Sequence, residues 1–201
     1  LFRSLARETI AMMDEYWNHP RCLAVGEIGF NNITENEEKV FVEQLRIGLK
    51  RNMPIMIHTP HIPKLEGTKR SVEICKAEGA PQHLVLIDHN TEQTMPVSYP
   101  AGYWCGMTVY PYSKLSIERV IAILREWGVE RMMVNSSADW GVSDPCNVVN
   151  VARAMLDAGF SEADVHKLTF ENPRAFYSQN PRFQCDLNIP AQDPAQFQRL
   201  P

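Results

Sequence analysis

Short apolar runs alternate with longer amphipathic segments along most of the chain. The runs have the length of buried strands, and the segments carry apolar residues every three or four positions, as a helix with one buried face does. Between residues 35 and 51, for example, Val40, Phe41 and Leu45 fall at helical spacing, and Thr34 stands where an N-cap is expected. This alternation is typical of a parallel α/β fold.

The pattern predicts five strands, most of them about 30 residues apart, which is the length of a βα unit. The expected strands are 22–27, 53–58, 83–89, a run within 102–109, and 131–137. The expected helices are 4–17, 35–51, 68–78, 115–127, 146–158, 161–167 and 172–178, with a short helical stretch before the fourth strand. Pro and Gln are frequent after Pro181, so an irregular tail is expected over residues 181–201.

Two architectures accept five such strands. An open, doubly wound sheet is complete with five, whereas a closed (β/α)8 barrel needs eight and would lack three on the N-terminal side. Apart from the βα period, the sequence shows no internal repeat and no linker. We therefore expect residues 1–201 to form a single domain.

Composition narrows the classes of partner. The chain has 201 residues, 44% of them hydrophobic, a net charge of −4 and a pI of about 5.9, so it has no polycationic footprint for nucleic acid. No apolar run approaches the roughly 20 residues of a membrane-spanning helix. The five cysteines are widely spaced and form no C-x-x-C pair, which favours reduced thiols. We expect a cytoplasmic protein without a membrane partner, and the sequence indicates no oligomeric state.

Ionisable residues stand at the ends of the predicted strands. Glu27, His58 and His89 each end a strand, and Asp139 follows the fifth. In a parallel barrel these ends converge on the face where active sites are built. Two imidazoles and two carboxylates at one point suit Zn²⁺, with Mn²⁺ or Mg²⁺ as alternatives, and a metal would offset the cost of burying Glu27.

Each of these residues has an ordinary structural explanation when it is considered alone. His58 or His89 could be a core histidine that hydrogen-bonds to backbone. Glu27 could pair with an arginine or cap the next helix, and Asp139 could be an N-cap or turn residue. The combination of all four is harder to explain in this way.

Further polar residues near strand ends are candidates for contact with a substrate. His61, three residues after His58, could be an additional ligand, a substrate contact or a solvated loop residue, and we favour substrate contact. Asn135 and Trp140 lie on or beside the same strand-end loops. For Asp88 we expect a structural role, because strand alternation sends its side chain to the face opposite that of His89.

Five motifs in this order resemble the TatD-like hydrolases of the amidohydrolase superfamily, with a secondary likeness to its phosphotriesterase branch. They are "GEIGF", "ENEEKVFVEQLRIGLKRNMPIMIHTP", "LIDHN", "NSSADWGVSDP" and "ENPRAFY". The likeness spans roughly residues 22 to 178. It implies a (β/α)8 barrel with one or two divalent metal ions.

The resemblance also implies roles for the four strand-end residues. Glu27 is similar to the carboxylate that bridges two metals in the family, and His58 and His89 to the ligands of the second metal. Asp139 is similar to the aspartate that binds the first metal and exchanges a proton with the attacking water. Phosphotriesterases usually bridge with a carbamylated lysine, so the glutamate favours the TatD side.

One departure from the family pattern concerns the first metal. The family opens with an H-x-H pair on its first barrel strand, and these 201 residues contain none. The strand count agrees, so we expect about the first three βα units to be absent from this chain. Without them the first metal would keep only Glu27 and Asp139, whereas the second could persist through Glu27, His58 and His89.

The sequence therefore favours a divalent-metal-dependent hydrolase that acts on phosphoester or other ester or amide bonds, with Asp139 as the catalytic residue. The expected substrate is a small molecule or a phosphoester, and charge does not favour a nucleic acid. One alternative is a metal-binding or scaffold protein that keeps the barrel without turnover. Another is an open, flavodoxin-like sheet that binds phosphate, although no Gly-rich loop follows a predicted strand.

Overall fold

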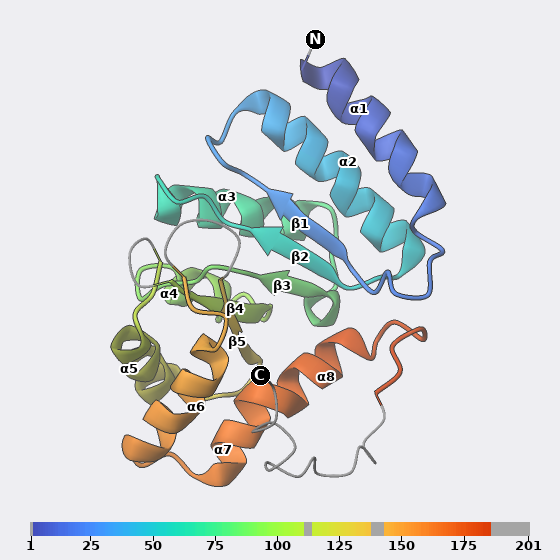
Figure 1. Cartoon of the computed structure of the whole chain (residues 1–201). Coiled ribbons are helices and arrows are strands. Elements are labelled where there is room, and N and C mark those ends of the chain that lie inside the picture. The colour runs from blue at the N-terminus through green and yellow to red at the C-terminus, as the bar shows by residue number, and fades with distance from the viewer. Residues whose placement is uncertain (1, 111–113, 138–142, 186–201) are drawn as a thin grey trace, which may run out of the picture.

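The computed structural model describes residues 2–110, 114–137 and 143–185, which form a curved parallel sheet with helices around it (Figure 1). Its five strands are β1 (Val25–Gly29), β2 (Ile55–His58), β3 (Val85–Ile87), β4 (Trp104–Val109) and β5 (Met132–Ser136). All neighbours pair in parallel, and the order across the sheet is β1-β2-β3-β4-β5. The prediction of five strands is confirmed.

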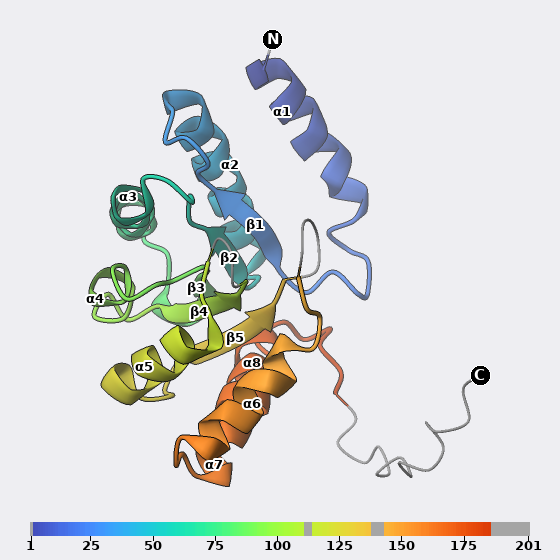
Figure 2. The same ribbon diagram turned by 60° about the vertical axis from the view of Figure 1, so that its left-hand side comes forward.

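Helices connect the strands and flank the sheet. They are α1 (Phe2–Met12), α2 (Glu35–Arg51), α3 (Lys64–Ala77), α4 (Met95–Ser98), α5 (Ile117–Trp127), α6 (Asn147–Asp157), α7 (Glu162–His166) and α8 (Asn172–Tyr177). Short 3₁₀ turns cover Met13–Glu15 and Gln82–Leu84, and a π-helical turn covers Lys167–Glu171. Figure 2 shows α2, α3, α4 and α5 on the outer side of the sheet. None of the described helices is long and apolar enough to cross a membrane.

The strand order decides between the two architectures that five strands allowed. A doubly wound sheet reverses its strand order part of the way across, and helices then cover both faces. Here the order follows the chain without reversal, which is how the strands of a barrel succeed one another. The doubly wound and flavodoxin-like alternatives are therefore wrong.

The main core lies between the sheet and the outer helices. On β2, Ile55 and Ile57 face outward and are fully buried, in the same apolar cluster as Phe41 and Leu45 of α2. α2 begins with a capping box, in which Thr34 Oγ1 accepts from the Glu37 amide, as expected for the N-cap. The apolar spacing along α2 thus fixes which face of the helix meets the sheet.

A smaller apolar layer covers the inner face of the sheet. It joins Met56, Leu86 and Met133 from three strands to Phe176 and Tyr177 of α8. α8 is held in place by Asn172, whose side-chain amide donates to the carbonyl oxygens of Val129 and Met132, both at 2.7 Å. The inner face is therefore apolar where these residues pack, which leaves the region near the carboxyl ends of the strands for polar groups.

Several element boundaries differ from the predictions. Glu27 lies inside β1, because Ile28 and Gly29 continue the pairing with β2 opposite Ile57 and His58. β3 stops at Ile87, so His89 lies two residues beyond its strand. α3 starts at Lys64, four residues earlier than predicted, because the chain turns into the helix directly after Pro63.

Asn172 supports a prediction about the attachment of α8. Replacing Asn172 by Ala leaves two buried carbonyl groups without their donor, so the free energy of unfolding should fall by about 2 to 4 kcal/mol. Urea denaturation of the purified chain measures this change. Arg174→Ala, an exposed change on the same helix, is the control, and an equal effect of both substitutions would contradict the anchoring role.

Candidate metal centre

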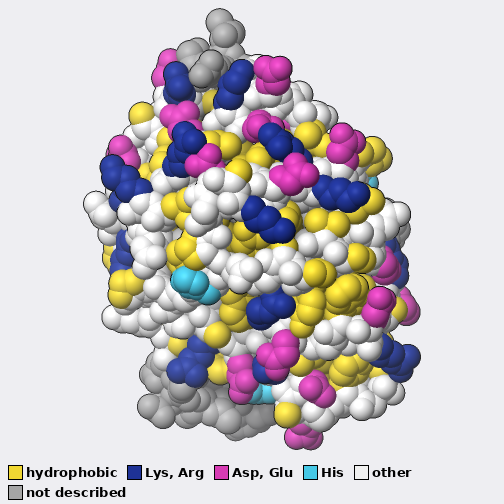
Figure 3. Space-filling view, turned by 180° about the vertical axis from the view of Figure 1, so that it is seen from behind, with side chains coloured by type: hydrophobic (Ala, Val, Ile, Leu, Met, Phe, Trp, Pro, Cys, Tyr) yellow, Lys and Arg dark blue, Asp and Glu magenta, His cyan; other side chains and the backbone are white. Residues whose placement is uncertain are grey.

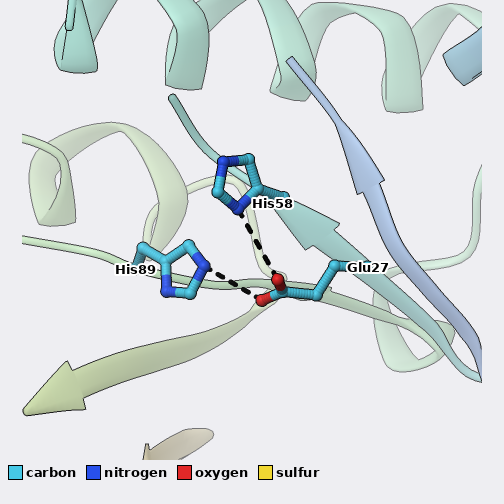
Figure 4. A group of neighbouring side chains, drawn as sticks. All are labelled: Glu27, His58 and His89. Atoms are coloured by element: carbon cyan, nitrogen blue, oxygen red, sulfur yellow. Dashed lines mark ion pairs between the residues drawn. The ribbon is translucent and has the colours of Figure 1, made fainter. Parts of the chain in front are cut away.

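Glu27, His58 and His89 converge at the C-terminal edge of the sheet (Figure 4). His89 Nε2 lies 2.9 Å from Glu27 Oε1, and His58 Nδ1 lies 3.6 Å from Glu27 Oε2. One ligand atom from each residue can be chosen so that all three lie within 4.8 Å of one another. Three of the four predicted ligands thus come together.

The sheet brings these side chains to one level. Register places Gly29 opposite His58, so the ends of β1 and β2 are aligned. Beyond β3, His89 adopts a left-handed backbone conformation with φ of 60°, which is uncommon for a residue other than glycine and costs about 1 to 3 kcal/mol. This turn aims the His89 ring back at Glu27.

The same turn corrects the expectation for Asp88. Strand alternation does not continue past Ile87, so Asp88 and His89 both line the inner cavity. The Asp88 carboxylate is buried and accepts from the His89 amide at 2.7 Å and from Asn135 Nδ2 at 3.2 Å. Gly106 makes room for it, because a Cβ at that position would lie 2.2 Å from Asp88 Oδ1.

Thr108 of β4 supports the His89 ring from behind. Its Oγ1 lies 2.6 Å from His89 Nδ1, and both side chains are buried. A metal-binding imidazole usually donates its second ring proton to such a neighbour, which fixes the tautomer. In the tautomer that a bound metal ion would select, Nδ1–H donates to Thr108 and the Nε2 lone pair of His89 is directed at the position beside Glu27.

The local charges keep Glu27 ionised. Hydrogen bonds from His58 and from His89 hold the pKa of its carboxyl well below the usual range, although partial burial acts in the opposite direction. The residues fit a divalent metal ion, because one carboxylate and two imidazoles present their ligand atoms to a shared point. This donor set suits Zn²⁺ and related ions.

A cavity of about 400 Å³ opens beside these ligands. Its lining includes Glu27, Asp88, His89, Thr108, Asn135 and Tyr177. Polar groups occupy the upper part, near the strand ends, and the apolar layer of the inner face forms the floor. The arrangement resembles a small-molecule site, in which a few polar groups orient a ligand against apolar walls.

The remaining predicted site residues have different outcomes. Asn135 lines the cavity, where it binds Asp88. His61 is exposed on the loop between β2 and α3 and is not among the residues that line this cavity, so its substrate contact stays a prediction. Asp139 and Trp140 lie outside the described residues, and their roles also stay predictions.

Sequence reasoning missed Thr108, Lys64 and Lys114. Thr108 lies inside a strand, where a threonine is ordinary, and only the bond to His89 gives it a role. Lys114 follows β4, at the same edge as the histidines, and its position in the βα loop was a usable signal. Lysine is not an ordinary ligand of divalent metals, so the pattern of His, Asp and Glu at strand ends did not include it.

Comparison with known proteins gives consistent results. The family model described as TatD related DNase matches residues 3–178. A curated protein of Methanocaldococcus jannaschii, described as an uncharacterized metal-dependent hydrolase, is 27% identical over 168 residues, which are 84% of this chain and 66% of that protein.

Solved structures also share the fold. A TatD-like protein from Archaeoglobus fulgidus is 30% identical with a TM-score of 0.68, and the match covers 84% of this chain and 65% of the other. The phosphotriesterase homology protein of Escherichia coli, solved with phosphate in its active site, is 21% identical with a TM-score of 0.60, over 77% and 57% of the two chains. The predicted barrel-type fold is confirmed, and the chain spans about two thirds of the length of the two archaeal relatives.

The Thr108 contact leads to a prediction about metal affinity. Thr108→Val keeps the shape of the side chain but removes the partner of His89 Nδ1, so affinity for a divalent ion should fall about 10- to 100-fold. Titration against a competing chelator measures it. Thr108→Ser keeps the hydroxyl and is the control; if Val and Ser variants bind metal equally well, Thr108 does not orient the ligand.

Proposed function

Because the chain belongs to the family of TatD-related DNases, we propose that it acts as a divalent-metal-dependent hydrolase on phosphoester bonds or other ester or amide bonds. The observation that carries this proposal is the convergence of Glu27, His58 and His89 beside a cavity. These three residues lie at the carboxyl ends of parallel strands, which is where barrel enzymes build their active sites.

We propose zinc as the first candidate for the metal, since two nitrogen ligands and one oxygen ligand suit it. Glu27, His58 and His89 would hold the ion, and Thr108 would fix the ring of His89. A bound divalent ion would lower the pKa of water and polarise a phosphoryl or carbonyl oxygen.

Residues of the protein would support the ligands, transfer the proton and limit access of water. Asp88 accepts from the His89 amide and from Asn135, which keeps the turn after β3 in place while a substrate enters and leaves. Asp139 keeps the role expected from the sequence, which is to accept a proton from the attacking water and return it to the leaving group. The apolar floor limits water access from below.

The charge distribution supports a small substrate. Figure 3 shows the molecule from behind, where Lys and Arg are interspersed with Asp and Glu and form no continuous basic stripe on that face. Several of these cations pair with carboxylates, as Arg46 does with Glu78 at 2.7 Å and Arg70 with Glu38 at 2.6 Å. Together with the net charge of −4, this favours a small phosphoester over a long nucleic acid.

We also propose a reducing compartment, in agreement with the expected cytoplasmic location. All five cysteines are free, and burial raises the pKa of both Cys75 and Cys105 to about 12, so these two remain thiols. The wide spacing of the cysteines in the sequence supports the same proposal.

The metal ligands can be tested directly. Glu27→Gln and His58→Ala each remove one of three ligands, so metal affinity should fall by more than about 100-fold and hydrolysis of bis(4-nitrophenyl) phosphate should fall with it. Elemental analysis and a steady-state assay measure the two effects. His83→Ala, an exposed histidine outside the site, is the control.

The same experiment separates the proposed function from its alternative. Unchanged metal content and turnover in both ligand variants would refute the hydrolase site. Metal binding without hydrolysis of phosphodiester, lactone or DNA substrates would instead favour a non-catalytic metal-binding protein.

A further inference from the structure

One wall of the cavity is formed by α8, which packs on the inner face of the sheet. Its two ends are fixed to backbone near the starts of β5 and β1. Asn172 donates to the Met132 carbonyl at 2.7 Å. Asn180, which follows the helix, donates to the Leu23 carbonyl at 2.9 Å. These two anchors hold the backbone of Tyr177, the last residue of α8, beside the cavity that its side chain lines.

The phenolic hydroxyl of Tyr177 has a weak hydrogen-bond partner. It lies 3.3 Å from Met56 Sδ, and a thioether sulfur is a poorer acceptor than an oxygen. Within the described part of the chain, this hydroxyl has no other hydrogen-bond partner. Burial, and then the charges of Asp88 and Glu27, raise the pKa of Tyr177, so the hydroxyl keeps its proton at neutral pH. A donor that could accept a better partner therefore borders the cavity.

From the metal ligands toward the amino ends of the strands, the wall of the cavity is apolar. Met56 lies two residues before His58 on the same face of β2, and Met133 lies two residues before Asn135 on β5. A strand rises about 3.3 Å per residue, so the methionines lie about 7 Å from the level of the polar residues. That depth is close to the length of a substituted six-membered ring. Methionine side chains also adapt to bound groups and make favourable contacts with aromatic rings.

We propose that this part of the cavity is a subsite for the organic group of the substrate, an apolar ring with one oxygen acceptor to which Tyr177 donates its phenolic proton. The proposal rests on the proposed function and names its substrate class, which is esters or amides of such a ring. On binding, the hydroxyl would exchange a thioether for an oxygen, the stronger acceptor. A ring without the oxygen would leave the hydroxyl on Met56.

Two small fragments test the subsite directly. Acetophenone is a ring with one carbonyl oxygen, and ethylbenzene is a ring of similar size without one. Tyr177→Phe should weaken the binding of acetophenone about 5-fold, which is the effect of one hydrogen bond, and leave that of ethylbenzene unchanged. Titrations followed by NMR of the ¹³C-labelled methionine methyl groups measure both affinities, and a Met56→Leu variant assigns the Met56 resonance.

The Met56 methyl group also reports how acetophenone binds. Acetophenone should shift its resonance in the wild-type chain, because the Tyr177 hydroxyl leaves the thioether. Tyr16→Phe, which removes the hydroxyl of an exposed tyrosine, is the matched control, and circular dichroism verifies the fold of each variant. Equal effects of Tyr177→Phe on the two fragments, or no shift of the Met56 methyl resonance by acetophenone, would overturn the proposal.

A kinetic comparison adds a readout that a merely structural role would not move. In the metal-containing protein, Tyr177→Phe should lower kcat/KM about 5-fold for 4-acetylphenyl methyl phosphate and leave the value for 4-ethylphenyl methyl phosphate unchanged. Equal losses on both substrates would contradict the subsite. Loss of the metal from Tyr177→Phe would contradict it too, because the tyrosine would then support the metal ligands.

Titration of the full chain before and after chelator treatment keeps this result separate from that of the proposed function. Fragment binding that depends on Tyr177 in a chain that holds no metal supports the subsite and refutes the hydrolase site. A chain whose metal and turnover depend on Glu27 and His58, but whose fragment binding ignores Tyr177, supports the hydrolase site and refutes the subsite.

Discussion

The parallel pairing of β1, β2 and β3 in chain order determines where the whole site lies. Backbone hydrogen bonds set Gly29 opposite His58 and join the Asp88 amide to the Ile57 carbonyl at 2.8 Å, so three distant segments end at one level. Side chains alternate along each strand, and a slip of one residue would therefore turn a ligand toward the outer helices. The outer core prevents such a slip, because it needs Ile55 and Ile57 on the other face.

Around the ligands, the protein accepts a backbone conformation that few residues adopt. His89 stays left-handed because its amide, its ring and its neighbour Asn90 all have partners, and the Asn90 side chain donates to the Ile87 carbonyl at 2.7 Å. Such strain persists where the surroundings determine the geometry, and it often marks functional sites. The polar groups of this turn are thus satisfied before any ligand arrives, so the turn keeps its shape without one.

Hydrophobic periodicity was sufficient to predict five parallel strands and the positions of Glu27, His58 and His89 near the strand ends, but it left the order of the strands across the sheet open. It could not predict the turn at His89, because histidine adopts a left-handed conformation too rarely for its presence to indicate one. The prediction that the Asp88 side chain lies on the face opposite that of His89 was consequently wrong. Thr108, Lys64 and Lys114 were also not predicted, because their roles depend on contacts between segments that only the folded chain brings together.

Gly106 has a consequence for how the sequence of this site can diverge. Its missing side chain is the space that the Asp88 carboxylate fills, so a methyl group on β4 and a carboxylate after β3 exclude each other. Substitutions at positions 88 and 106 are therefore expected to occur together. A relative that carries a larger residue at the place of Gly106 must also have shortened or moved the acid, and with it the support of the histidine beside it.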